Sequence, residues 1–205
     1  MGWTSYHATH YKRGTVDRKA ECDAYFLDSL NRGFYRIEKS TMVGSVYYAA
    51  VTAIKRFKKD VPEKEEQYED IPESEQRTFG VVFLTSVDMK DYYNFSYKDM
   101  EETCGPYNYD CPESILKLLS PTTSEFALQW REKCREHRKK RMDLDKFPVG
   151  TIIEFEDHTG ETKSYVKHEP AFQFQKPFWY NPEGHSYVPK HYIPDSYRVV
   201  NKEDK

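Results

Sequence analysis

The sequence predicts an α+β protein in which a mostly antiparallel sheet is packed by two main helices and followed by a small SH3-like β-barrel. Two observations lead to this fold class. Segments rich in Val, Ile, Tyr and Thr recur between short turns, which is typical of strands. Only two long segments have helical periodicity with start and stop signals. Aromatic residues make up 16% of the 205 residues and supply most of the expected core.

The first helix is expected over residues 17–32. Asp17 is a suitable N-cap and Gly33 a suitable C′ residue. Between them, the apolar residues share one helical face: Ala20, Ala24, Leu27 and Leu30.

The second helix is expected over residues 122–141. Thr122 and Glu125 have the spacing of a capping box. Phe126, Trp130 and Cys134 then repeat every four residues and predict the buried face.

Strands are expected near residues 3–11, 35–41, 46–57 and 77–87. Residues 46–57 and 77–87 form the simplest pairing, a long antiparallel hairpin. Between them, residues 60–76 carry eight acids and two prolines, which predicts a solvated, mobile acidic loop that is also able to meet a basic partner. Residues 94–116 are rich in turn formers and are interpreted as a fixed connection.

A domain boundary is expected at residue 146, with an α+β domain over 1–146 and a barrel module over 147–205. The second part has short β-rich pieces cut by turns at Thr159-Gly160, Pro182-Glu183-Gly184 and Pro194-Asp195. Five short strands in about 50 residues are typical of a small, partly closed barrel.

Charge and targeting signals favour a cytoplasmic protein. The net charge is −3, which makes a uniformly basic nucleic-acid binder an unfavourable interpretation. The sequence has no secretory pattern and no apolar run long enough for a membrane span, so we expect no membrane partner. The four cysteines are then expected to be reduced thiols.

Cys104 and Cys111 are the weak candidates for metal ligands. They stand seven positions apart, wider than a usual zinc half-site. His7 and His10 would have to complete the site, but a spacing of three places them on opposite faces of a strand. We therefore predict no metal site and expect the thiols to fill small apolar gaps.

One enzyme hypothesis remains, although the sequence has no phosphate loop, nucleophile elbow or H-E-x-x-H motif. The stretch "YHATH" at 6–10 is similar to the strand His-x-Thr element of ADP-ribosyltransferases, and "GSVYYAAV" at 44–51 resembles their Gly-x-Tyr-Phe-Ala element. The resemblance implies NAD as cofactor, with His7 on the ribose, Tyr47 or Tyr48 on the nicotinamide, and Glu101 or Glu102 as the acid. The alternative is that these are ordinary residues of a half-buried strand.

Two surfaces are candidates for binding a protein or a nucleic acid. The end of the second helix is rich in cations, which suits phosphate contacts or simply the helix dipole. The barrel module places aromatic residues beside cations, which suits base stacking, a peptide groove or a plain core. The binding candidates are Arg131, Arg135, Arg138, Lys139, Arg141, Phe178, Trp179, Tyr187 and Lys190.

Four stretches carry a second resemblance: "GWTSYHATHYKRGTVDRKAE", "STMVGSVYYAAV", "VVFLTSVDMKDYYNFSYKDMEETCGPYNYDCPESIL" and "FALQWREKCRE". Over roughly residues 2–155 the chain resembles a family of uncharacterised proteins carried by bacteriophages and conjugative elements of Gram-positive bacteria. The resemblance implies an accessory protein inside a bacterial host cell and no particular reaction. We therefore expect a non-enzymatic protein without a cofactor, which binds a host protein, such as defence machinery, or nucleic acid.

Overall fold

The computed structural model describes residues 6–11, 17–24, 27, 33–58, 67–89, 93–104, 108–157, 159–171, 176–194 and 196–200. The chain divides into two compact units, which we call the N-terminal unit (Met1–Arg135) and the C-terminal unit (Glu136–Lys205). The division lies inside the helix α3 (Glu125–Lys146), whereas the sequence placed the boundary at the end of this helix. The difference arises because the last turns of α3 belong to the core of the C-terminal unit.

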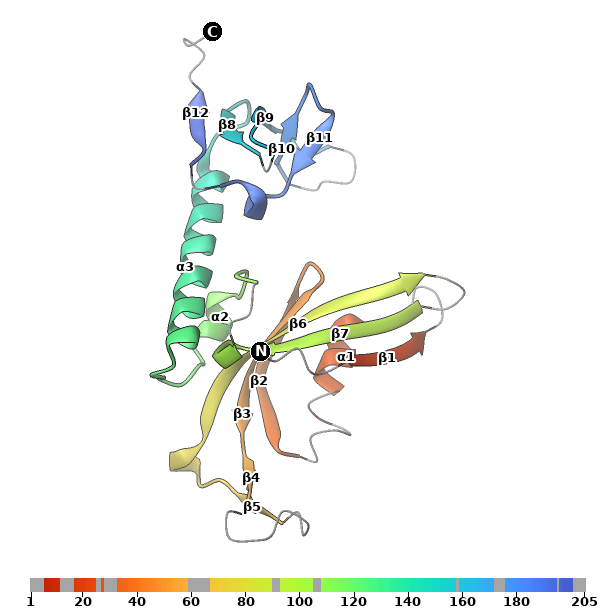
Figure 1. Cartoon of the computed structure of the whole chain (residues 1–205), viewed down its shortest axis with the longest axis vertical. Helices are drawn as coiled ribbons and strands as arrows, with labels where there is room; N and C mark the ends of the chain where they lie inside the picture. The colour runs from red at the N-terminus through yellow and green to blue at the C-terminus, as the bar shows by residue number, and fades with distance from the viewer. Residues whose placement is uncertain are drawn as a thin grey trace. The chain divides into compact units, whose positions relative to one another are not determined.

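An antiparallel five-stranded sheet forms the centre of the N-terminal unit, with the order β1-β7-β6-β3-β2 (Figure 1). The expected hairpin is confirmed, since β3 pairs with β6 from Val46↔Leu84 to Ala53↔Arg77. The strands are β1 (Tyr6–Tyr11), β2 (Tyr35–Val43), β3 (Val46–Ala53), β6 (Arg77–Met89) and β7 (Tyr93–Glu101).

The interpretation of residues 94–116 as a connection is wrong for its first third. These residues begin with most of β7, which lies between β1 and β6 inside the sheet. The adjacent polar residues Lys98 and Asp99 interrupt the alternation before the buried Met100, so the strand pattern is hidden in the sequence. Two short helices follow, η4 (Glu102–Cys104) and α2 (Glu113–Leu116).

The acidic segment 60–76 is also more ordered than the sequence indicated. Residues 59–66 lie outside the described part, but β5 (Tyr68–Asp70) pairs with β4 (Lys55–Phe57), and η3 (Glu73–Glu75) follows. Arg56 donates hydrogen bonds to Glu69 at 2.6 Å and to Glu75 at 2.7 Å. The expectation of a loop is therefore wrong for 68–70 and for 73–75, where Arg56 pairs with one acid of each segment.

Helices cover both faces of the central sheet (Figure 1), which explains why β3 is buried along most of its length. On one face lies α1 (Arg18–Ala24), whose Cys22 packs in a cluster with Tyr47 and Phe83. The Asp17 carboxylate accepts a hydrogen bond from the Ala20 N–H at 3.0 Å, as its predicted N-cap role requires. The rest of the predicted helix, except Leu27, lies outside the described residues.

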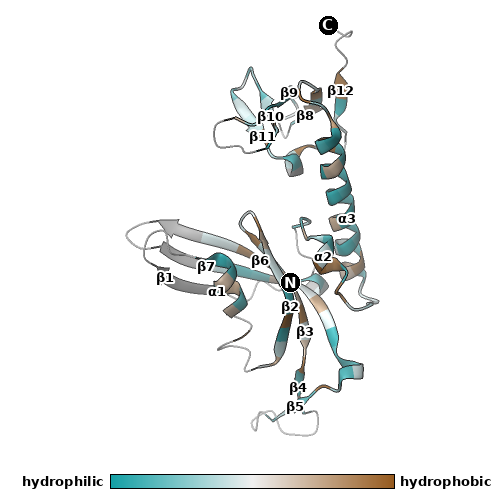
Figure 2. Ribbon diagram, turned by 180° about the vertical axis from the view of Figure 1, so that it is seen from behind, coloured by the Kyte–Doolittle hydropathy of each residue, from teal (hydrophilic) through white to brown (hydrophobic). Residues whose placement is uncertain are grey.

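The opposite face of the sheet packs against α2 and the first half of α3. Ala127, Trp130 and Cys134 of α3 are buried, and Figure 2 shows the rest of this helix as mostly hydrophilic. The helix begins slightly later than predicted, because Ser124 and not Thr122 caps it: the Ser124 hydroxyl accepts from the Ala127 N–H at 3.4 Å. It also extends five residues beyond the predicted end at 141.

The C-terminal unit contains an antiparallel five-stranded sheet with the order β11-β10-β9-β8-β12. Its core consists of Leu144, Ile153, Phe155, Tyr165, Trp179 and Ile193. The elements are β8 (Ile152–Glu156), β9 (Thr162–His168), β10 (Phe178–Asn181), β11 (Ser186–Val188), η5 (Lys190–Tyr192) and β12 (Arg198–Val200). Over its described residues the sheet is open, with β11 and β12 at its edges, and no closed barrel is found.

A buried lysine from a neighbouring strand caps the C-terminal end of α3. The ammonium of Lys167, on β9, donates hydrogen bonds to the carbonyl oxygens of Leu144 at 3.2 Å, Asp145 at 2.8 Å and Phe147 at 2.6 Å. Burial lowers the pKa of this ammonium. A cation at this end of a helix satisfies the last carbonyls and complements the helix dipole.

Replacing Gly80 by alanine should destabilise the N-terminal unit. A Cβ atom at Gly80 would lie 3.0 Å and 3.2 Å from two atoms of the Trp130 ring. We expect Gly80→Ala to lower the free energy of unfolding by about 1–3 kcal/mol, measured by urea denaturation. The double variant Gly80→Ala with Trp130→Phe should lose less free energy of unfolding than the sum of the two single variants. Strict additivity of the two losses would show that the Trp130 ring does not restrict position 80.

Replacing Lys167 by methionine should destabilise the C-terminal unit, because three carbonyls at the end of α3, one buried and two part-buried, lose a charged donor. We expect a loss of about 2–3 kcal/mol in the free energy of unfolding. Lys176→Met is the control, since Lys176 is exposed. Equal stabilities of the two variants in urea denaturation would contradict the capping role.

Candidate functional site

The two tyrosines of the enzyme hypothesis lie inside the protein. Tyr47 and Tyr48 are both fully buried, and as neighbours on β3 they enter the clusters on opposite faces of the sheet. The Tyr48 hydroxyl accepts a hydrogen bond from the Asp110 N–H at 3.1 Å. His7 lies opposite Tyr97 in the β1–β7 register, and its side chain is outside the described part. Neither tyrosine ring is therefore available to stack on a nicotinamide in this structure.

Tyr47 instead holds α1 against the sheet. Its ring stacks on Phe83 with centroids 5.3 Å apart, and Phe83 stacks on Tyr97 at 4.7 Å. Its hydroxyl donates to the Asp23 carboxylate at 2.8 Å, and the Ser40 hydroxyl donates to the same oxygen at 2.6 Å. Burial raises the pKa of Tyr47 far above its usual range, so the phenol stays protonated as a hydrogen-bond donor.

The acids of the hypothesis, Glu101 and Glu102, differ sharply in environment. Glu101 is exposed, and the Thr103 hydroxyl donates to it at 3.4 Å. Glu102 is 2% exposed and accepts two hydrogen bonds from Arg131, from Nε and Nη2, each at 2.8 Å. The Gly80 N–H also donates to Glu102, at 3.1 Å. The buried carboxylate is thus fully engaged in holding the fold.

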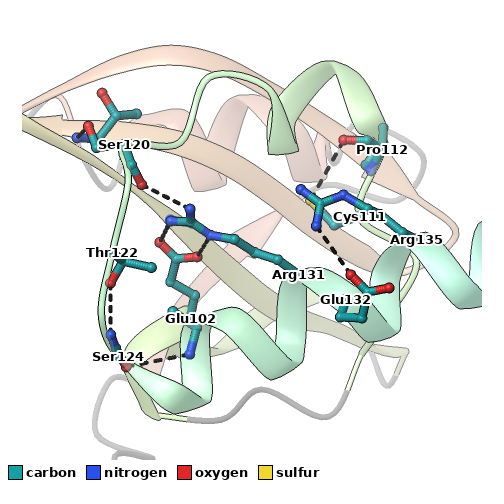
Figure 3. Close-up of polar contacts among 12 residues, drawn as sticks. Glu102, Cys111, Pro112, Ser120, Thr122, Ser124, Arg131, Glu132 and Arg135 are labelled. Carbon is teal, nitrogen blue, oxygen red and sulfur yellow. Dashed lines mark hydrogen bonds and ion pairs between the residues drawn. The ribbon is translucent and has the colours of Figure 1, made fainter.

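Arg131 was expected on a binding surface, and the structure places it inside the protein. It is 8% exposed, and besides its contacts with Glu102 it donates from Nη1 to the Ser120 carbonyl at 2.9 Å (Figure 3). The reason is its position: Arg131 follows the buried Trp130 and precedes the buried Cys134 by three residues, so it lies on the inner side of α3. The cationic surface of the helix therefore begins after Arg131.

The remaining cationic candidates lie at the surface of α3. In the N-terminal unit, Arg135 lies 3.6 Å from Glu132. In the C-terminal unit, Arg138 and Lys139 are exposed and Arg141 is half-buried.

The described cysteines are buried and unreactive in character. Cys111 and Cys134 lie in one core cluster and Cys22 in the other. Burial raises the pKa of the Cys22 and Cys134 thiols to about 12, so neither is a thiolate at neutral pH. Cys111 fills an apolar gap, as predicted, and the Cys104 side chain is outside the described part. Over the described residues, no group of three or more His, Cys, Asp and Glu side chains is placed to hold a metal ion.

The binding candidates of the C-terminal unit separate into two sets. Trp179 is 1% exposed and belongs to the core, and Lys190 forms an ion pair with Asp145. Phe178 and Tyr187 lie on the other side of the sheet, because residues that alternate with the core residues of a strand face away from the core. Of the four candidates, these two lie on the side of the sheet that faces away from the core.

This other side, which we call the outer face, carries one apolar row across all five strands. The register pairs Tyr187 with Tyr180, Tyr180 with Val166, Val166 with Ile152, and Ile152 with Val200. Directly opposed residues of neighbouring strands share a face of the sheet. The outer face thus comprises Ile152, Val166, Tyr180, Tyr187 and Val200, with His168 and Phe178 beside the row.

Aromatic rings interlock at one end of the outer face. The His168 and Phe178 rings stack with centroids 5.8 Å apart at 24°. The Tyr180 ring meets His168 edge-on at 5.6 Å and 84°. Tyr187 beside them is 52% exposed. These contacts hold the His168, Phe178 and Tyr180 rings against one another.

The sequence predicted Phe178 and Tyr187 as binding candidates, and Tyr180 is among the aromatic residues that stand beside cations. The sequence did not single out the other residues of the outer face: Ile152, Val166, His168 and Val200. The signal that could have found them is the alternation within "KSYVKH" and "FWYN", where Tyr165 and Trp179 point inward and their neighbours outward. The alternation alone does not say which of two successive residues on a strand points into the core, so the two faces of the sheet could not be told apart from the sequence.

Comparison with protein-family models, with curated proteins and with solved structures finds no match for this chain. Over the described residues, no helix combines the length and the apolar character needed to cross a membrane.

Breaking the buried ion pair should destabilise the N-terminal unit strongly. Glu102→Gln keeps the shape of the side chain but leaves the Arg131 guanidinium buried without a counter-charge. We expect a loss of about 3–5 kcal/mol in the free energy of unfolding, measured by urea denaturation. Glu132→Gln on α3, the helix that carries Arg131, affects an exposed pair with Arg135 and should change the free energy of unfolding by less than about 1 kcal/mol. Similar values for both variants would contradict a stabilising role for the buried pair.

Proposed function

We propose that this chain is a non-enzymatic accessory protein of a phage or other mobile element, which binds a protein of its bacterial host in the cytoplasm through the outer face of the C-terminal sheet. The observation that carries the proposal is the row of apolar side chains that crosses five strands. The mobile-element context rests on the sequence resemblance alone.

The composition of the outer face supports a protein partner. The centres of protein interfaces are rich in aromatic residues and poor in charge, and the outer face combines Tyr180, Tyr187 and Phe178 with aliphatic residues. Its charged pair, Arg198 and Glu154, lies beside the row with atoms 2.7 Å apart. This arrangement of an apolar centre and a polar edge suits a host protein that offers an apolar surface of its own.

The charges of the C-terminal unit favour a protein over a nucleic acid. The unit contains twelve Lys and Arg and twelve Asp and Glu, so it has no net positive charge. Single-strand binding surfaces place cations along the stacking rings. Here the end of α3, with Arg138 and Lys139, packs through Leu144 on the core side of the sheet, opposite the outer face.

We also propose that the C-terminal unit is a small, partly closed barrel of SH3-like type. The last strand, β12, lies beside the first, β8, so the chain returns to its starting strand. The strands have three to seven residues, a length that small barrels use. In such a barrel the outer face would be the convex side.

The ADP-ribosyltransferase hypothesis has no comparable support, because Tyr47, Tyr48 and Glu102 are buried and bonded within the fold. The binding role that we propose requires no cofactor.

The test places a photo-crosslinking residue, p-benzoylphenylalanine, at Tyr187 and separately at Tyr192. Tyr192 is 69% exposed but lies on η5, outside the apolar row, and serves as the matched control. In extract of a Gram-positive host, position 187 should capture a defined protein that position 192 does not. With that protein purified, Tyr180→Ser and Tyr187→Ser should each raise Kd about tenfold or more.

Equal capture from both positions, or a Kd unchanged by both substitutions, would contradict the proposed surface. Retardation of an oligothymidylate that weakens with salt and with Tyr187→Ser would instead favour nucleic-acid binding.

A further inference from the structure

We draw no further inference here: the strongest candidate, the aromatic surface patch that Phe34, Phe57 and Tyr68 form at the two-stranded sheet of β4 and β5, carries nothing, because nothing in the structure shows what covers it.

Discussion

The carboxylate of Glu102 is the point at which separate segments of the N-terminal unit meet. It binds the backbone of β6 at Gly80 and the guanidinium of Arg131 on α3, which in turn binds the carbonyl of Ser120 in the segment before the helix. Burying two charges costs much solvation energy, and it is tolerated only where each charge is fully bonded. The sheet, α3 and the segment before the helix must therefore all be in their native positions before both charges are fully bonded. Trp130 can then lie against the bare backbone of Gly80.

Local signals in the sequence predicted the elements that have regular patterns. The hairpin of β3 and β6 and the helix α3 were expected, because β-branched runs and four-residue repeats are visible without knowledge of the fold. β7 was missed because Lys98 and Asp99 interrupt its alternation. β5 was missed because one of its two acids, Glu69, forms an ion pair with Arg56, a residue from the neighbouring strand. For β5 the deciding partner lies on another strand, which the local pattern does not show.

The candidate site was predictable to a smaller extent. Arg131 was assigned to a surface because it begins a run of cations, although its spacing from Ala127 and Cys134 places it on the buried side of the helix. The outer face could not be assembled from the sequence, since each of its residues is ordinary alone. Ile152 and Val200 become neighbours of Val166 only through the pairing of strands far apart in the chain. Surfaces built across strands carry no local motif, whereas loops that bind phosphate or metal often do.

The cap of α3 by Lys167 has a consequence for the order of folding. The donor that completes the helix lies on β9, 20 residues after Phe147. As the chain leaves the ribosome, the last turn of the helix is made before the residue that satisfies its carbonyls. The carbonyls of this turn have no charged donor until β9 docks beside them. The end of the helix is therefore stabilised only by a contact with a residue that is distant in the sequence. Co-translational appearance of the complete helix should accordingly lag behind its synthesis by the length of the intervening hairpin.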